Sequence, residues 1–521
     1  MEAHDYYANP RILIPATSFF SLLRATATLV SHWALILVFT ALYRLSPFHP
    51  LAKYPGPVLG KLSKFYLAYL AGHGDAHTVI RGLHQQYGDV VRVGPNELSF
   101  NRVDALQPIY AMKSMPKGPC TTDYNSRVHE DGSRPLDSLQ DFSVHAARRK
   151  PWTKAMSPVN SKNFDPIIVQ KARELMEELA KHQGQPVNIA HWMMLYGYDF
   201  MGHLVFGREF GMLKAGKDNS GLIHGLEHGL YSSSMIAHIP WSLPILQCLP
   251  IGDGGSVTMQ RLANDIVRKR QDAGSHAKDI YYYLVSTSSA CQELLAEGLL
   301  AIIAGADTTA VTLCHFMYFM MRHPECADSL RREVDAAFPH GDEPTDHSRL
   351  ANMPYLNACI NETLRLLPPV LTGLQREVQR GSDGAMIGPY FVPGGTPVSI
   401  HVYSLHRNPE EFSPLPDTFW PERWLTRNEY TLPTGEVLSK DQVVTNRAAF
   451  VPFSFGPQNC AGKALASVEL RVVISALVQK FEVRKAKEYD IDDWEKNLRD
   501  HYVTLTGPLQ AVLTSHELND S

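Results

Sequence analysis

The chain has 521 residues, of which 49 are Lys or Arg and 53 are Asp or Glu, so its formal net charge is −4. This near-neutral balance argues against a dedicated nucleic-acid-binding protein, which would carry a basic excess. Gly and Pro, at 35 residues each, exclude a collagen-like or wholly disordered chain, and a hydrophobic fraction of 44% is ample for a large core. The seven cysteines are odd in number and widely spaced, so they predict reduced thiols, of which one or more could hold a metal.

An apolar segment near the N-terminus predicts a membrane anchor. Residues 25–43 contain no Asp, Glu, Lys or Arg, and about 20 apolar residues span a bilayer core. A cleaved signal peptide would have a shorter apolar region and a small-residue cleavage site; a buried core helix is the other alternative. Basic residues follow the segment, which places the rest of the chain in the cytosol, although two Arg residues before it weaken this asymmetry. We expect a lumenal tail over residues 1–24, a single-pass transmembrane anchor over 25–43 and a proline-rich hinge over 44–59.

Residues 60–521 are expected to form one large domain that is mainly α-helical with a minor β-sheet region. The sequence shows no repeat and no low-complexity block in this part. An almost unbroken apolar stretch over 290–322 predicts one long helix, and amphipathic patterns predict shorter helices over 354–367 and 463–481. Strand-like segments are few and short. They cover residues 90–93, 390–392, 397–400 and 502–506.

The segment 453–462, Phe-Ser-Phe-Gly-Pro-Gln-Asn-Cys-Ala-Gly, carries the most specific signal in the sequence. A loop with Pro and Gly delivers Cys460 just before a helix that begins near Gly462. Backbone N–H groups and the helix N-terminus are therefore expected to surround the sulfur and to lower the pKa of the thiol. A buried structural cysteine is the alternative for any single Cys. The pattern Phe-x2-Gly-x3-Cys-x-Gly, however, would occur by chance on the order of one time in a thousand at this composition.

This segment resembles the cysteine-ligand loop of the heme-thiolate monooxygenases, the cytochrome P450 superfamily. In that family the Cys is the axial ligand of heme iron, so the resemblance implies that Cys460 binds the iron of heme b. The segments 48–57 and 92–98 resemble the fungal microsomal branch, many members of which tailor secondary metabolites. The sequence contains no flavin or nicotinamide motif. The resemblance therefore implies that electrons come from a separate, membrane-bound NADPH-dependent reductase.

Glu362-Thr-Leu-Arg365 matches the family's Glu-x-x-Arg motif. The i, i+3 spacing places both side chains on one helix face, where they can pair, although about one such match is expected by chance in a chain of this length. Pro421-Glu-Arg423-Trp resembles the loop whose Arg completes a buried triad with that Glu and Arg. The resemblance implies that Glu362, Arg365 and Arg423 are structural supports of the heme core and are not catalytic.

Residues 304–309, Ala-Gly-Ala-Asp-Thr-Thr, lie in the middle of the long apolar helix. An acid and hydroxyls there are costly unless they are hydrogen-bonded, and a helix kink with a satisfied Thr is one interpretation. The segment also resembles the oxygen-activation groove of the family. The resemblance implies that Gly305 leaves room for O₂ and that Asp307 and Thr308 are the catalytic pair that relays protons through water.

Cationic side chains are expected to hold the heme propionates, which need charged or donor partners. His145 and Arg149 lie where the family has Trp/His-x-x-x-Arg, and Arg376 matches a second propionate Arg. Each could instead be a solvated surface charge. The sequence departs from the family at Gln458, where Arg or His is usual two residues before the Cys. Because Gln donates a hydrogen bond but carries no charge, one propionate contact is expected to be weakened or rearranged.

The resemblance implies a monooxygenase that inserts one oxygen atom from O₂ into a lipophilic small molecule, such as a terpenoid or polyketide. It further implies a single-pass protein of the endoplasmic reticulum membrane, in contact with the lipid bilayer and with a cytosolic catalytic domain. No nucleic-acid partner is expected. The substrate is expected to contact segments 113–144, 230–250 and 370–374 and the helix face of Ile302, Ala306 and Thr309. The reductase is expected to meet a basic patch of Arg148, Lys150, Lys463 and Arg471.

Three alternatives share parts of this pattern. A heme-thiolate isomerase or dehydratase would need no external electrons, and the Asp307–Thr308 pair argues against it. A heme-binding sensor or carrier would be no enzyme and would need no proton relay. A membrane-anchored structural protein with a buried Cys would bind no heme.

Overall fold

The computed structural model describes residues 16–122, 134–248, 256–274, 278–285, 291–339 and 342–516. The chain divides into two compact units, Met1–Lys53 and Tyr54–Ser521. The division falls inside the predicted hinge over residues 44–59.

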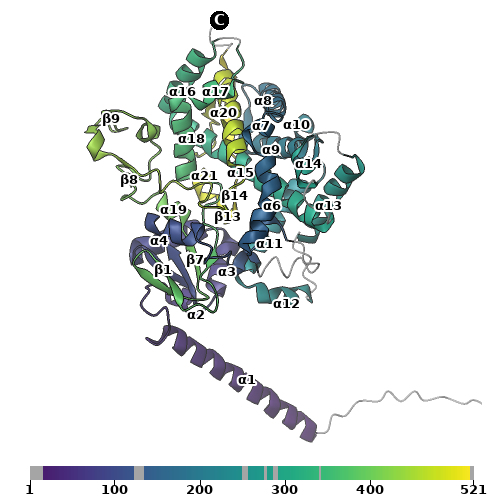
Figure 1. Ribbon diagram of the computed structural model, residues 1–521, viewed down its shortest axis with the longest axis vertical. Helices are drawn as coiled ribbons and strands as arrows, with labels where there is room; N and C mark the ends of the chain where they lie inside the picture. The colour runs from purple at the N-terminus through teal and green to yellow at the C-terminus, as the bar shows by residue number, and fades with distance from the viewer. Residues whose placement is uncertain are drawn as a thin grey trace, which may run out of the picture. The chain divides into compact units, whose positions relative to one another are not determined.

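The first unit contains one long helix, α1 (Ala16–Leu45) (Figure 1). Within it, Leu23–Leu45 is apolar, exposed and long enough to cross a membrane. Its 23 residues extend over about 34 Å, compared with about 30 Å for a bilayer core. The helix begins before the predicted anchor because Arg24 interrupts the apolar run without disfavouring helix. This apolar helix is therefore a candidate membrane anchor.

The second unit is mainly helical with small sheets, which confirms the predicted fold class (Figure 1). The longer helices are α3 (Phe65–His73), α4 (Ala76–Tyr87), α6 (Phe142–Ala155), α8 (Asp165–Ala180), α9 (Ile189–Phe206), α11 (Leu222–His238), α13 (Ser256–Asp272), α15 (Cys291–Arg322), α16 (Pro324–Ala337), α18 (Pro354–Leu366) and α20 (Lys463–Lys480). The shorter ones are α2 (Val58–Leu62), α7 (Pro158–Ser161), α10 (Met212–Ala215), α12 (Leu243–Gln247), α14 (Ile280–Val285), α17 (His347–Ala351), α19 (Val402–Leu405) and α21 (Asp493–Lys496).

The largest sheet has the strand order β1-β2-β7-β4. Its strands are β1 (Val90–Gly94), β2 (Glu97–Phe100), β7 (Pro397–Ile400) and β4 (Arg376–Glu377). A three-stranded sheet joins β12 (Phe481–Lys485), β15 (Gln510–Ser515) and β3 (Pro186–Asn188). Pairs of strands complete the set: β5 (Gly384–Ile387) with β6 (Tyr390–Pro393), β8 (Phe412–Ser413) with β11 (Val444–Thr445), β9 (Glu429–Thr431) with β10 (Val437–Ser439), and β13 (Arg499–His501) with β14 (Val503–Leu505).

The two central helices, α9 and α15, approach each other closely because glycines remove side chains at their contact. A Cβ atom on Gly197 would lie 2.7 Å from the carbonyl oxygen of Ala306, and one on Gly305 would lie 2.3 Å from Cε of Met201. Both distances are shorter than a van der Waals contact, so neither glycine can be enlarged without moving the helices. That Gly305 leaves room for O₂ stays a prediction; in the structure its missing side chain also accommodates Met201.

Helix α6 begins at a side-chain cap that orients the residues it carries. The Asp141 carboxylate accepts hydrogen bonds from the backbone N–H of Ser143 (2.7 Å) and Val144 (2.9 Å), which satisfies two donors at the helix start. His145 and Arg149 follow at i, i+4 spacing and therefore lie on one face of α6.

Candidate functional site

An internal cavity of about 340 Å³ lies in the second unit. Helix α15 contributes Ala301, Ala304, Gly305 and Thr308 to its wall, and the loop before α20 contributes the segment 451–462. The lining is mainly apolar, apart from a group of basic side chains, the acids Asp137 and Glu469, and the thiol of Cys460. One cysteine and several cations thus face the same enclosed space.

Cys460 faces the cavity, and its side chain is accessible from it. Its backbone N–H donates to the Phe453 carbonyl (2.9 Å). Burial raises the pKa of the thiol, whereas the N–H groups of Gly462 and Lys463 and the Arg149 guanidinium act in the opposite direction. The donors are those that the sequence predicted, but the predicted lowering of the pKa is wrong for the protein alone because burial outweighs them. A metal cation at the sulfur would favour the thiolate.

The loop is fixed on its other side by a close backbone approach. Gly456 has φ of +78°, and a Cβ atom there would lie 2.4 Å from the carbonyl oxygen of Tyr110. Tyr110 belongs to the single-turn helix η2 (Gln107–Ala111). Only glycine combines this backbone conformation with this contact, which explains why the loop carries Gly at position 456.

Three basic side chains line the same cavity, Lys117, His145 and Arg149, and Arg376 lies next to Lys117. Lys117 and Arg376 face each other across an antiparallel β-bridge, an arrangement in which like charges repel. Burial lowers the pKa of Lys117 to about 7. It also lowers the pKa of His145 to about 4, to which Lys117 and the two Arg side chains contribute. These shifts indicate a concentration of positive charge that the nearby acids Asp137 and Glu297 offset only in part.

The hydrogen bonds of the cationic residues differ from one to the next. Arg149 donates to the backbone oxygen of Asn459 (2.5 Å) and to Oδ1 of Asn459 (2.8 Å), so it is joined to the Cys loop. Both terminal nitrogens of Arg376 are buried with no hydrogen-bond partner, and so are both side-chain polar atoms of Gln458. Lys117 donates to the Leu136 carbonyl (3.0 Å). Buried donors left unpaired in this way are costly unless a ligand accepts from them.

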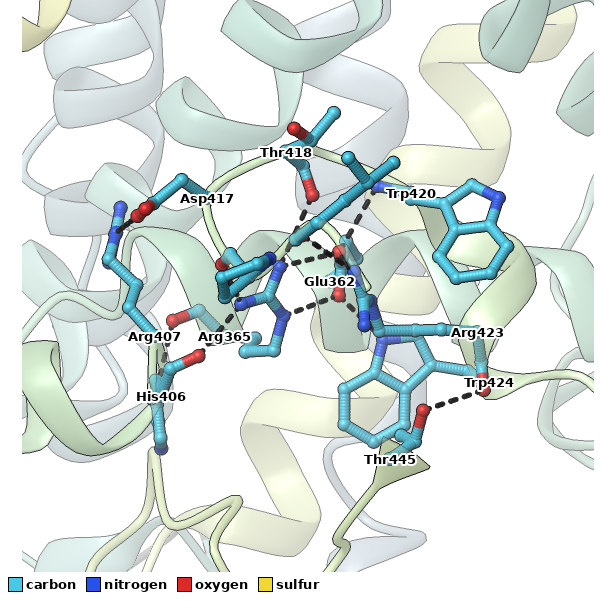
Figure 2. Close-up of polar contacts among 12 residues, drawn as sticks. Glu362, Arg365, His406, Arg407, Asp417, Thr418, Trp420, Arg423, Trp424 and Thr445 are labelled. Carbon is cyan, nitrogen blue, oxygen red and sulfur yellow. Dashed lines mark hydrogen bonds and ion pairs between the residues drawn. The ribbon is translucent and has the colours of Figure 1, made fainter. Parts of the chain in front are cut away.

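The predicted triad residues lie together in a buried cluster (Figure 2). Arg365 donates to Glu362 twice, at 2.8 and 2.7 Å, and Nε of Arg423 donates to Glu362 at 3.1 Å. The backbone N–H of Trp420 (3.1 Å) and the indole N–H of Trp424 (2.8 Å) complete the acceptor capacity of the carboxylate. Although burial alone would raise the pKa of Glu362, Arg365 and Arg423 lower it below its usual value. The carboxylate is therefore ionised and paired.

His406 connects this cluster to the Cys loop. Its Nδ1 lies 3.1 Å from the Arg365 carbonyl, and its Nε2 lies 2.9 Å from the backbone nitrogen of Val451. Nε2 must accept from that N–H, so Nδ1 carries the proton and donates. Burial lowers the pKa of His406 to about 3, which keeps the ring neutral. Because Val451 lines the cavity, the paired cluster supports the cavity wall through one histidine.

The two residues of the predicted catalytic pair point in different directions from α15. Thr308 lines the cavity, and its hydroxyl donates to the Ala304 carbonyl (2.7 Å). Its oxygen remains available as an acceptor. The Asp307 carboxyl is buried on another face of the helix, where it accepts a hydrogen bond from the Tyr198 hydroxyl (2.6 Å). Burial raises the pKa of Asp307 to about 7.

Several predicted contacts lie elsewhere. Among the described residues, no part of segment 230–250 lines the cavity, and Ile302 and Ala306 are buried in packing away from it. Segments 113–144 and 370–374 do contribute, as does Thr309; residues 123–133 lie outside the described part. Arg148 of the predicted basic patch pairs with Glu293 and Glu297, so its charge is neutralised.

A family model described as Cytochrome P450 matches residues 50–512, which is most of the chain. The chain belongs to the cytochrome P450 family. It is 32% identical over 491 residues to the cytochrome P450 monooxygenase phqL of Penicillium fellutanum, covering 90% of this chain and 81% of that protein. It is 32% identical over 490 residues to the cytochrome P450 monooxygenase FCK2 of Fusarium pseudograminearum, with 92% and 84% covered. It is 30% identical over 507 residues to the tryprostatin B 6-hydroxylase of Aspergillus fumigatus, with 95% and 85% covered.

This cytochrome P450 is therefore a heme-dependent monooxygenase that uses O₂, a small-molecule substrate and a redox partner. The family cofactor, heme b, carries two carboxylates, and the unpartnered buried donors of Arg376 and Gln458 suit such anions. The accessible sulfur of Cys460 suits the iron. The residues present thus fit the cofactor.

The sequence did not point to three side chains that shape the site. Lys117 reaches the cavity through a β-bridge between distant segments, and Tyr198 meets Asp307 through helix packing. His406 is placed by a tertiary contact with the Cys loop. The only local signal was Gly197 beside Tyr198, which is typical of close helix packing but names no partner.

Proposed function

We propose that this cytochrome P450 oxidises a lipophilic, uncharged small molecule of fungal secondary metabolism, with electrons from a membrane-bound NADPH-dependent reductase. The observation that carries the proposal is the accessible thiol of Cys460 in an enclosed cavity with a cationic end. Relatives named as monooxygenases, one of them a tryprostatin B 6-hydroxylase, support the tailoring role.

In this proposal the Cys460 sulfur would bind the heme iron and the cationic residues would hold the propionates. Arg376 supplies two unpartnered donors, and His145 and Lys117 supply others. Arg149 has a second function, because its guanidinium ties α6 to Asn459 beside the ligand. The cluster of Glu362, Arg365 and Arg423 acts at a distance as a structural support.

When bound, heme iron ligated by a thiolate activates O₂. The net reaction consumes a substrate C–H bond, O₂, two electrons and two protons, and it yields a hydroxylated product and water. The Thr308 hydroxyl can accept a hydrogen bond from water in the cavity while it donates its own proton to the Ala304 carbonyl. Asp307, whose pKa is raised to about 7, holds a proton that can be donated near neutral pH.

The substrate class follows from the cavity wall away from the cations. Leu300, Ala301, Ala304, Val370 and Leu374 give this wall no charge, so a charged substrate would lose hydration without gaining a partner. An apolar wall of small side chains on α15 suits a bulky ring system. The proposal therefore names polycyclic lipophilic compounds, with terpenoids and polyketides as examples.

We also propose the cellular arrangement. Residues 1–24 form a lumenal tail, 25–43 lie within the anchor and 44–59 form the hinge, so the domain over 60–521 faces the cytosol from the endoplasmic reticulum membrane. The exposed apolar helix supports this. The reductase would meet Lys150, Lys463 and Arg471 on the Cys-loop side; Arg148 is excluded because it is paired with two carboxylates.

The first test is the absorption spectrum of dithionite-reduced protein with and without CO. A strongly red-shifted Soret band is expected for thiolate ligation, and Cys460→Ala should abolish it. Oxidation of a ligand found by spin-state shift should then require NADPH and reductase. Turnover without external electrons would instead favour an isomerase or dehydratase, and absence of O₂ uptake with every lipophilic ligand would favour a heme sensor.

Thr308→Ala tests the hydroxyl. It should raise the share of consumed O₂ that is released as H₂O₂, because water in the cavity loses its acceptor. The matched control is Thr363→Ala on α18, which removes an equivalent hydroxyl that donates to the Cys359 carbonyl (2.9 Å) outside the cavity. Equal coupling in the Thr308 variant and the control would contradict the role of Thr308.

A further inference from the structure

Helices α6 and α15 are joined by the buried carboxylate of Glu297, which belongs to α15 and is 3% exposed. It accepts a hydrogen bond from the Arg148 guanidinium and one from the indole N–H of Trp152 (3.1 Å), both on α6. The same guanidinium lies 3.1 Å from the carboxylate of Glu293, one turn earlier on α15. Two side chains of each helix therefore form one polar contact, which is buried at Glu297 and Trp152.

The spacing of the residues on both helices places this contact at the end of the heme cavity. On α15, Glu297 precedes the cavity-lining residue Ala301 by four positions, so it continues the helix face that walls the cavity. On α6, Trp152 follows Arg149 by three positions and His145 by seven, and all three line the cavity. The Glu297 carboxylate therefore holds the cavity-facing side of α6 against α15.

The charge of Glu297 acts on the basic side chains of the cavity. Burial is the largest cause of the low pKa of Lys117, and both Asp137 and Glu297 act against it. Burial also raises the pKa of Glu297 itself to about 7. Arg148 and Trp152 act in the opposite direction, and Asp137 adds to the rise. The carboxylate thus changes its charge near neutral pH, within electrostatic reach of a residue that lines the heme cavity.

We propose that Glu297 is a positioning residue that sets the reduction potential of bound heme, through Arg148 and Trp152 of α6. Its hydrogen bonds fix the helix that carries His145 and Arg149, and its charge offsets part of the positive charge at that end of the cavity. The proposal rests on the proposed monooxygenase function and adds a determinant of how readily heme accepts an electron from the reductase. Glu297 does not line the cavity, so it acts through its partners on α6.

The direction of the effect follows from the charge. A nearby carboxylate stabilises ferric heme more than ferrous heme, which carries one positive charge less. Loss of the Glu297 charge should therefore raise the midpoint potential. In the wild-type protein the potential should fall between about pH 6 and pH 8, on either side of the pKa of Glu297. Among the described residues, the other charged groups near Glu297 are Arg148, Glu293, Asp137 and Lys117.

The experiment measures the midpoint potential of the full-length, heme-loaded protein by spectroelectrochemical titration at several pH values, and the rate of heme transfer to apomyoglobin. Glu297→Gln keeps the shape of the side chain and removes its charge. At pH 8 and a fixed applied potential it should raise the ratio of ferrous to ferric heme up to about tenfold, about 59 mV for a one-electron couple. It should also reduce the fall of the potential with pH.

Trp152→Phe separates position from charge. It removes the indole N–H and leaves the Glu297 carboxylate in place, so the potential should still fall with pH. Heme loss should become several-fold faster, because α6 loses a hydrogen bond to α15 worth about 1 kcal/mol.

Two matched controls change similar groups elsewhere in the chain. Glu333 of α16 also joins two helices, since it accepts from the backbone N–H of Tyr355 (2.8 Å) and Leu356 (2.7 Å) at the start of α18. Trp494 is buried, and its indole N–H has no hydrogen-bond partner. Neither residue lines the heme cavity. Glu333→Gln and Trp494→Phe should therefore keep the wild-type potential and the wild-type rate of heme loss.

A raised potential with a smaller pH dependence in Glu297→Gln, faster heme loss in Trp152→Phe and unchanged controls support the proposal. A Glu297→Gln potential that follows wild type at every pH overturns it, and so does an equal effect of Glu333→Gln. If Glu297→Gln does not fold, Trp152→Phe is compared with Trp494→Phe, and equal rates of heme loss overturn the proposal. Failure of the proposed function would show separately, as a missing thiolate-type CO band in the wild-type protein.

Discussion

Two buried groups of charged residues differ in whether the protein itself balances them. Around Glu362, one carboxylate meets two guanidinium groups, and five hydrogen bonds satisfy it. Near Arg376, three basic side chains line a cavity, and two nitrogens of the Arg376 guanidinium have no partner. In the first group the carboxylate is fully satisfied and one nitrogen of Arg423 has no partner, whereas in the second both terminal nitrogens of Arg376 have none and suit an anion.

Whether a buried charge is paired within the protein distinguishes a structural role from a ligand-binding role, and no relative is needed for this distinction. Evolution can retain a buried charge for packing only if it is paired, because an unpaired one costs several kcal/mol (on the order of 3–5). The unpaired cations near Cys460 are therefore best explained by a ligand with negative charge. Mutations that remove a charge should therefore lower the free energy of unfolding in the paired group and raise that of the apoprotein in the unpaired group.

The largest effect is expected at the paired group. Glu362→Gln keeps the shape but leaves Arg365 and Arg423 without a counter-charge, so the free energy of unfolding should fall by about 3–5 kcal/mol. Urea denaturation followed through the heme spectrum measures this loss. The control is Glu343→Gln, whose side chain is 55% exposed and pairs with Arg173; such surface pairs contribute about 0–1 kcal/mol. Equal losses in both variants would mean that the buried pair contributes no more than a surface pair.

Arg376→Met should stabilise the apoprotein and weaken the binding of heme. Without heme, removal of an unpaired buried charge should raise the free energy of unfolding by about 1–3 kcal/mol. With heme, loss of charge-assisted hydrogen bonds worth about 1.5–3 kcal/mol should weaken binding by about 10- to 100-fold. Urea titration of apoprotein and heme transfer to apomyoglobin measure the two effects. A destabilised apoprotein would show that Arg376 is structural.

The sequence was informative where chemistry depends on residues that are close in the chain. Cys460 could be identified from the spacing of its flanking glycines, and Glu362 with Arg365 at i, i+3 only together with the segment Pro421-Glu-Arg423-Trp. The direction of Asp307 could not, because adjacent helical residues differ by about 100° in direction and only tertiary packing decides which one faces a cavity. Lys117 was missed for the same reason, since it meets Arg376 across a bridge between segments far apart in sequence.

We expect Lys117 to make the stability of the apoprotein depend on pH, and we expect bound heme to remove this dependence. Burial lowers its pKa to about 7 in the protein without an anion, below the usual value of about 10.4. Between these values the unfolded chain binds the proton and the folded apoprotein does not, so apoprotein stability should rise from pH 7 to pH 10. Lys117→Met should flatten this slope, and so should bound heme. Urea denaturation at several pH values measures it, and a slope retained in the Met variant would assign it to other groups.

The smallest effect is expected from a change that adds charge. Gln458 is buried with both side-chain polar atoms unpartnered, at the position where the resemblance to the family leads us to expect Arg or His. Gln458→Arg should lower apoprotein stability by about 1 kcal/mol, because it adds a further cation, and should slow heme loss several-fold, because it adds a propionate donor. Gln458→Met, similar in size and uncharged, is the control and should leave heme loss nearly unchanged. Faster heme loss from the Gln458→Arg variant would contradict this expectation. It would mean that the cations already present suffice for the two carboxylates of heme. The uncharged Gln458 would then keep the charge of this group in balance with its ligand.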